Sequence, residues 1–361
     1  MLSAILKHLE ALVGFDTRNP PRAIGTGGIF DYLQNALPGF RHEVVDHGDG
    51  AVSLLSVRGA PRRVFNFHLD TVPASAGWSR DPLKLLVTAD RASGLGACDI
   101  KGAAAAMLVA AERSRGDLAL LFSSDEEAND ARCIKAFLDT DHGYTQAIVA
   151  EPTNAHAVLS HRGLVSAAAT FSGIAGHGSE ARALDDNAVH RAVHWAERAL
   201  AHARLLESQS FDGLSGIRLN LGRIEGGIKG NVIAPSCEIR FGFRPLPSQP
   251  VDGIFALLRN LVPPGHLAGL EQLFHGPSLP AATGMQAESR LQGARELASG
   301  LGLPIGPAVN FWTEASLFSQ AGLDAIVYGP GDIAQAHSAD EWVSLEQLEN
   351  VAANYQRMTD E

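Results

Sequence analysis

Short apolar runs alternate with helix-like stretches through the first 160 residues of the chain. The runs lie in VFNFHLD, LALLF and AIVAEPT, and the alanine-rich stretch KGAAAAMLVAAERSR separates the first two. Such alternation is typical of βαβ units, in which helices connect parallel strands. The pattern predicts an α/β protein with a mixed, mostly parallel sheet covered by helices.

This alternation of strand-like and helix-like segments stops near residue 163 and resumes after residue 275. The segments VSAAATFSG, IRLNLGRI and CEIRFGFR read as strands, and DDNAVHRAVHWAERALAHARL reads as a long helix with Asp186 as its candidate N-cap. Near the C-terminus, SLEQLENVAANYQRM reads as a helix that opens with a capping box of Ser344 and Gln347. Because 361 residues exceed one hydrophobic core, we expect a discontinuous domain of residues 1–162 and 276–361, interrupted by a smaller α+β domain at residues 163–275.

Composition and charge exclude several classes of protein. With 45% hydrophobic and 19% charged residues the chain reads as globular, and no apolar run reaches the roughly 18 residues of a membrane span. Lys7 and Glu10 interrupt the opening apolar segment, so we expect a first helix of a cytoplasmic protein rather than a signal peptide. The net charge of -11 argues against nucleic acid as a partner. Three scattered cysteines favour buried thiols over a disulfide framework.

Three consecutive acids, Asp125, Glu126 and Glu127, follow the run Leu118 to Phe122. If that run is a buried strand, the acids lie at its carboxyl end, where open α/β sheets bind ligands. Adjacent side chains diverge, so one glutamate can bind a metal while the other takes a proton from an activated water. The alternatives are a solvated acidic loop and a glycosidase pair, although glycosidase carboxylates flank a sugar about 5–10 Å apart, which adjacent residues do poorly.

Two further segments carry candidate metal ligands. On a strand, His68 and Asp70 lie on one side about 7 Å apart, so Asp70 can hold one imidazole nitrogen while the other faces a metal; an ordinary polar pair is the alternative. Asp99 follows a glycine-rich loop in GLGACDIKGAAAA. It is either the N-cap of the following helix or a ligand that points inward.

Glu151, at the end of AIVAE, and His337, in AQAHSADE, complete a set of five candidate ligands. Two imidazoles and three carboxylates suit Zn²⁺ or a similar divalent ion. Five ligands are too many for one open catalytic zinc. If one carboxylate bridges, they suffice for two metals about 3.5–4 Å apart, as in dinuclear hydrolases.

The order of the motifs HLDTVP, GACDIKG, DEE, EPT and AHSADE resembles the dinuclear zinc deacylase and exopeptidase family. This family includes acetylornithine deacetylase, succinyl-diaminopimelate desuccinylase, aminoacylase and glutamate carboxypeptidases. The resemblance covers essentially the whole chain and implies a zinc-peptidase-like catalytic domain with an inserted dimerisation domain, or lid. Two residues depart from the family pattern, Phe67 in place of Gly and Glu180 near a usual Pro; both concern local loop shape and leave the ligand set intact.

Residue by residue, the resemblance implies roles around two metal ions. His68 and Glu151 would bind one ion, Glu127 and His337 the other, and Asp99 would bridge them. Asp70 would orient His68, and Glu126 would be the general base and acid.

The inserted segment carries three further matches. His177 in GIAGHGSE would stabilise the oxyanion in the partner subunit's site, which implies a homodimer. Asn231 would contact the substrate, and Arg244 would grip its carboxylate; a plain surface role is the alternative for Arg244.

The segments VNFWTEASLF and GPGDIAQAHSADE most resemble the acetylornithine deacetylase branch, and the whole sequence its N-acetylcitrulline variant. We therefore expect a metal-dependent hydrolase that removes the acetyl group from N-acetyl-L-citrulline, or from N-acetyl-L-ornithine, in arginine biosynthesis. The alternatives are another amide substrate, such as a dipeptide, a mononuclear enzyme, and a non-catalytic metal-binding relative. The working ion, zinc or cobalt, stays open.

Overall fold

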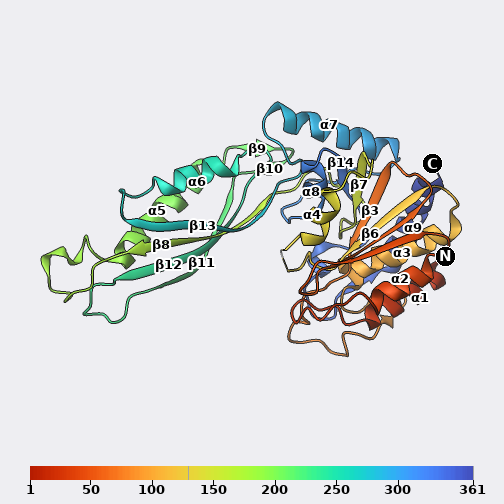
Figure 1. Ribbon diagram of the computed structural model, residues 1–361, viewed down its shortest axis with the longest axis horizontal. Helices are drawn as coiled ribbons and strands as arrows, with labels where there is room; N and C mark the ends of the chain where they lie inside the picture. The colour runs from red at the N-terminus through yellow and green to blue at the C-terminus, as the bar shows by residue number, and fades with distance from the viewer. Residues whose placement is uncertain (129, 361) are drawn as a thin grey trace. The chain divides into compact units, whose positions relative to one another are not determined.

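A computed structural model describes residues 1–128 and 130–360. The chain packs into two compact units (Figure 1). Unit 1 comprises Met1–Leu159, Arg290–Pro307 and the chain from Thr313 onward, and unit 2 comprises Ser160–Ser289 and Ala308–Trp312. The catalytic and dimerisation domains expected from the sequence, with their boundaries at residues 162 and 276, stay a prediction.

The main sheet of unit 1 has six strands in the order β1-β2-β6-β3-β7-β14. Strand β3 runs parallel to β6 and β7, β14 runs parallel to β7, and β2 runs antiparallel to β1 and β6. This arrangement confirms the mixed, mostly parallel sheet. The strands are β1 Arg41–Asp46, β2 Val52–Arg58, β3 Arg63–His68, β6 Leu118–Ser123, β7 Gln146–Val149 and β14 Asp324–Val327.

Helices cover the sheet of unit 1, and a small sheet in the order β15-β5-β4 lies in the same unit. The α-helices are α1 Leu2–Gly14, α2 Ile29–Ala36, α3 Gly102–Arg113, α4 Arg132–Leu138, α7 Met285–Gly300, α8 Ala315–Gln320 and α9 Leu345–Asp360, and the residues of α7 up to Ser289 belong to unit 2. The short elements are β4 Leu86–Val87, β5 Arg91–Ser93, β15 Trp342–Ser344, a π-helical turn η1 Ala97–Lys101 and a 3₁₀ turn η3 Ile333–Gln335.

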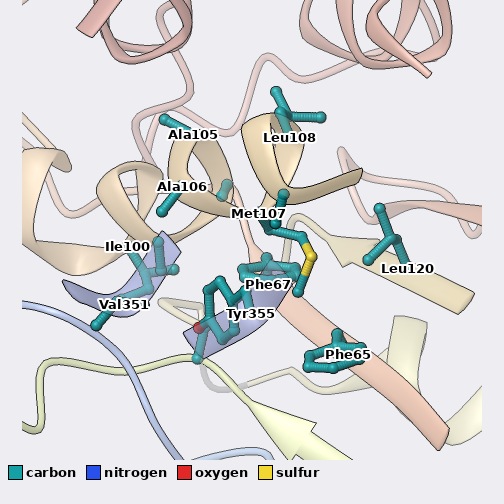
Figure 2. Packing of buried hydrophobic residues seen from close by; sticks show 14 of the residues in the cluster. Phe65, Phe67, Ile100, Ala105, Ala106, Met107, Leu108, Leu120, Val351 and Tyr355 are labelled. Carbon is teal, nitrogen blue, oxygen red and sulfur yellow. The ribbon is translucent and has the colours of Figure 1, made fainter. Parts of the chain in front are cut away.

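The core of unit 1 forms where α3 packs against α1, α9 and the sheet (Figure 2). Every residue of α3 from Gly102 to Ala111 is buried, because its run of alanines lets neighbouring backbones approach closely. Beside α3, the ring of Phe67 stacks on the ring of Phe122, with 5.6 Å between the ring centroids. It also meets the ring of Tyr355 edge-on, with 6.1 Å between the centroids. Phe67, which departs from the family pattern directly before His68, therefore packs in this core.

Unit 2 is built around an antiparallel sheet in the order β11-β12-β8-β13. Side chains from α5 and α6 form its core with the sheet, and Trp195 lies at the centre against Phe171 and Phe241. The elements are β8 Leu164–Ser172, η2 Ala181–Ala183, α5 Ala188–Leu205, β9 Ser210–Phe211, β10 Leu214–Ser215, β11 Arg218–Gly226, β12 Ser236–Arg244, α6 Val251–Arg259 and β13 Leu267–Gly276.

Two local expectations need correction. The N-cap of α5 is Asn187, whose side chain accepts hydrogen bonds from the N–H groups of Val189 and His190, whereas Asp186 pairs with two arginines, Arg182 and Arg191. The capping box at α9 is half formed. Ser344 accepts from the Gln347 N–H at 3.4 Å, but the Gln347 side chain bonds Gly331 and Asn154 instead of reaching back.

Two further features bear on the composition arguments. The three cysteines are free and buried. Among the described residues, no helix is long and apolar enough to span a membrane.

Candidate metal centre

The carboxyl ends of the parallel strands in unit 1 bring distant parts of the chain together. His68 is the last residue of β3, Glu127 follows β6 and Glu151 follows β7. Because these strands are parallel neighbours, their ends meet at one edge of the sheet. Asp99 reaches this edge from the turn η1 and His337 from the loop after η3.

These five side chains form two groups that share one carboxylate. His68, Asp99 and Glu151 make one group and Asp99, Glu127 and His337 the other, with ligand atoms within 4.8 Å of one another in each group. His68 Nε2 lies 3.0 Å from Asp99 Oδ1 and 3.8 Å from Glu151 Oε1. His337 Nε2 lies 3.4 Å from Asp99 Oδ2 and 3.0 Å from Glu127 Oε1. The two oxygens of Asp99 therefore face different groups.

Asp70 lies beside the Nδ1 atom of His68. It is outside β3, which ends at His68. His68 Nδ1 is 3.1 Å from the Asp70 backbone carbonyl and 3.7 Å from its carboxylate oxygen Oδ1, so the carbonyl makes the hydrogen bond. The other carboxylate oxygen of Asp70 accepts hydrogen bonds from the Asn19 side chain and the Glu127 N–H, each at 3.0 Å. Asp70 thus connects the segments that carry His68 and Glu127.

The three consecutive acids divide between different surroundings. Asp125 is fully buried and accepts from the N–H of Cys133 in the first turn of α4, so it belongs to the structural framework. Glu127 faces His337. Burial raises the pKa of Glu126 well above its usual range, and the nearby charges of Glu127, Glu151 and Glu314 raise it further against the opposing effect of His68. Glu126 therefore lies within the acidic cluster without joining either ligand group.

The electrostatics of the cluster fit a divalent cation. Burial raises the pKa values of Glu127 and Glu151, and the negative charge of Asp99 raises them further. Burial opposes ionisation of Asp99, but hydrogen bonds from His337 and His68 outweigh it and lower the Asp99 pKa. The hydrogen bonds of His337 to Asp99 and Glu127 raise the pKa of His337 to about 10. The two imidazoles thus face carboxylates whose negative charge a divalent cation would also stabilise, and imidazole and carboxylate donors suit such an ion.

Sequence reasoning missed several side chains near the site. Asn19, which bonds Asp70, precedes two prolines, and no motif marked it. Glu314 accepts from Ser123 Oγ at 3.1 Å, and burial raises its pKa to about 8. Glu341 accepts three backbone hydrogen bonds from the loop around Asp99, and burial raises its pKa to about 7. The signals for the last two were the triplet Thr313-Glu314-Ala315 and the final residue of AHSADE.

The three predicted residues of the inserted segment all lie in unit 2. His177 and Asn231 are neighbours there, because the Gly178 N–H donates to the Asn231 carbonyl at 2.8 Å and His177 pairs with Val232. The exposed His177 ring bonds Ser179 Oγ at 2.7 Å, and Glu180 accepts from the His177 N–H. Arg244 is the last residue of β12, in a cavity of about 510 Å³ whose lining includes Arg218 and Asn310.

Comparison with known proteins agrees with this geometry. Residues 64–361 match the profile of peptidase family M20/M25/M40. The chain is 56% identical over 359 residues to the N-acetyl-L-citrulline deacetylase of Xanthomonas campestris pv. campestris. The alignment covers 99% of this chain and 98% of the relative. It is 31% identical to the acetylornithine deacetylase of Vibrio vulnificus, with 96% of this chain and 94% of the relative covered.

Solved structures share the fold. The aminopeptidase PepT of Bacillus cereus superposes with a TM-score of 0.77 at 17% identity, covering 100% of this chain and 98% of the other. A dinuclear metal-binding M20 peptidase of Bacillus subtilis superposes with a TM-score of 0.69 at 14% identity, covering 99% and 97%. The family resemblance drawn from the five sequence motifs is confirmed, and the chain belongs to peptidase family M20/M25/M40.

Proposed function

We propose that this protein removes the acetyl group from N-acetyl-L-citrulline in arginine biosynthesis. Its family membership and its deacetylase relatives make it a metal-dependent amidohydrolase. The 56% identity to an N-acetyl-L-citrulline deacetylase favours that substrate. N-acetyl-L-ornithine is the second candidate, because relatives about 31% identical carry that activity in their names.

The observation that carries the proposal is the pair of ligand groups that share Asp99. In this proposal His68 and Glu151 would hold one divalent ion, Glu127 and His337 would hold the other, and Asp99 would contribute to both sites. Zinc is our first choice because imidazole and carboxylate ligands suit it, and cobalt is the second. When bound, such ions act as Lewis acids that acidify water and polarise an amide carbonyl.

The remaining side chains have assigned roles in the hydrolysis. Asp70 keeps the His68 imidazole oriented through Nδ1. Glu126 takes the proton of the attacking water, whose oxygen forms a bond to the acetyl carbon, and delivers that proton to the amine nitrogen as the C–N bond breaks. A proton carrier works best when its pKa lies near the operating pH, and burial moves the pKa of Glu126 upward from its ordinary value of 4.5. The products are acetate and a free amino acid.

In this proposal, three residues of the inserted segment act on the substrate. Arg244 would bind the α-carboxylate with its planar guanidinium, and Asn231 would donate to the substrate. His177 would stabilise the oxyanion in the site of a partner subunit, which makes the protein a homodimer. We place the protein in the cytoplasm, in keeping with its free, buried cysteines.

A Glu126→Gln variant tests the chemical role, since it keeps the shape and removes the proton acceptor. We expect acetate release to fall at least about 100-fold while two metal ions per chain remain bound. Glu112→Gln, a change at an exposed site on α3, is the matched control and should keep full activity. Near-full activity of the metal-loaded Glu126→Gln protein would refute the proposal.

Substrate choice is tested on protein reloaded with Zn²⁺ or Co²⁺ after chelation. We expect faster acetate release from N-acetyl-L-citrulline than from N-acetyl-L-ornithine, whose side chain ends in a charged ammonium group. The reverse preference would refute the assignment to the citrulline derivative, and activity on neither would refute both.

The role of His177 across subunits is tested by mixing two inactive variants, His177→Ala and Glu126→Gln. After subunit exchange, half of the dimers are hybrids and one of their two sites has every residue intact. Activity should therefore recover to about a quarter of the wild-type value. If His177 served its own subunit, no hybrid would contain an intact site and the mixture would stay inactive.

A further inference from the structure

Glu341 is a buried carboxylate outside both ligand groups, four residues after His337 and just before β15. It is 2% exposed. Its Oε1 accepts from the N–H groups of Cys98 at 2.8 Å and Asp99 at 3.0 Å, and its Oε2 accepts from the Gly96 N–H at 3.0 Å. The Glu341 backbone carbonyl accepts a further bond from the Gly94 N–H at 3.0 Å. One residue thus holds the loop that carries Asp99 at four points.

The loop itself has an irregular backbone. Gly96 has a left-handed conformation with φ of 76°. Asp99 (φ -122°, ψ 86°) and Ile100 (φ -140°, ψ 22°) lie outside helical geometry. At the start of such a turn the N–H groups lack partners within the helix. Glu341 supplies the acceptors for three of them.

A buried cation accompanies this carboxylate. Lys101, at the end of the same turn, is fully buried, and its Nζ donates to the Phe15 carbonyl at 3.0 Å. Its positive charge interacts favourably with Glu341, Asp16 and Asp70. Burial of a carboxylate is costly without a compensating charge, and Lys101 provides one.

We propose that Glu341 is a positioning residue for the metal centre, which sets the position of Asp99 relative to His337. Asp99 can face His68 with one oxygen and His337 with the other only if its backbone is held in place. Glu341 lies four residues after His337 in the chain and accepts a hydrogen bond directly from the backbone N–H of Asp99. It therefore connects a bridging carboxylate to a ligand of one group, and this inference rests on the proposed two-metal site.

The test compares E341Q with E346Q, a glutamine change at an exposed position on α9. The amide of E341Q presents one N–H₂ group to the loop N–H groups and loses the charge. We expect the metal affinity of E341Q, measured by competition with a chromogenic chelator, to be roughly 10- to 100-fold weaker than that of the wild type. The absorption spectrum of the Co²⁺-loaded protein should also change. In steady-state kinetics kcat should fall while KM stays near its wild-type value. E346Q should match the wild type throughout.

Wild-type affinity and an unchanged Co²⁺ spectrum in E341Q would overturn the inference. If E341Q does not fold, hydrogen exchange in the wild-type protein takes its place. Because Glu341 accepts from the N–H groups of Gly96, Cys98 and Asp99, these three amides should stay protected after chelation. Rapid exchange there would overturn the inference. Failure of the proposed function is distinguishable, because then the wild-type protein itself would bind no metal or release no acetate.

Discussion

Replacement of Phe67 by alanine should destabilise unit 1 and loosen its metal centre. The ring is fully buried between Phe122 and Tyr355, directly before His68 in the chain. A buried aromatic side chain removes about 150 Å² or more from water, which at about 25 cal/mol per Å² corresponds to about 4 kcal/mol. Measured Phe→Ala changes in protein cores cost about 3–5 kcal/mol, in agreement with this figure. We therefore expect a loss of about 4 kcal/mol in the free energy of unfolding of unit 1.

The assay is urea unfolding read by hydrogen exchange in peptides from β3 and β12. The β3 peptides should lose protection at a lower urea concentration, while those of β12, in unit 2, should not change. Val87→Ala, at a position 43% exposed, is the control and should change stability by less than about 0.5 kcal/mol. A loss below about 1 kcal/mol for Phe67→Ala, or equal shifts in both units, would refute the packing argument.

Two further predictions concern a buried acid and a helix cap. The folded pKa of Glu314, about 8, lies above its ordinary value of 4.5, so the native state keeps a proton that the unfolded chain releases. That contribution to stability is present below pH 4.5 and is lost as the pH rises toward 8, by about 1.4 kcal/mol per pH unit. Metal-free Glu314→Gln should therefore lose less stability than the wild type between pH 6 and 8 in urea titrations, and parallel slopes would contradict this. Asn187→Ala should lower the free energy of unfolding by about 1 kcal/mol, because α5 loses its N-cap, and Asp186→Ala should lower it by less. Hydrogen exchange at the start of α5 measures both changes. The opposite order would restore Asp186 as the cap.

Local patterns predicted the elements near the site well. The runs before His68, Glu127 and Glu151 form adjacent parallel strands, because a buried parallel strand needs a continuous apolar run and that is visible in one dimension. The ends of helices were harder to place. Asp186 and Asn187 are both good N-cap residues, and the backbone path selects the second. Gln347 is diverted from its capping box by Gly331 and Asn154, which come from distant parts of the chain.

The sequence by itself determined the fold class, the family and the types of ligand, because strand periodicity and the chemistry of side chains are local properties. The tertiary structure alone decided that Asp99 is no helix cap and that its two oxygens face two different imidazoles. It also showed that Asn19, Glu314 and Glu341 support the site from positions 51, 191 and 242 residues away from their partners. The physical reason is that a buried carboxylate takes its partners from whatever chain segments the packing brings within about 3 Å, and no local pattern records that choice.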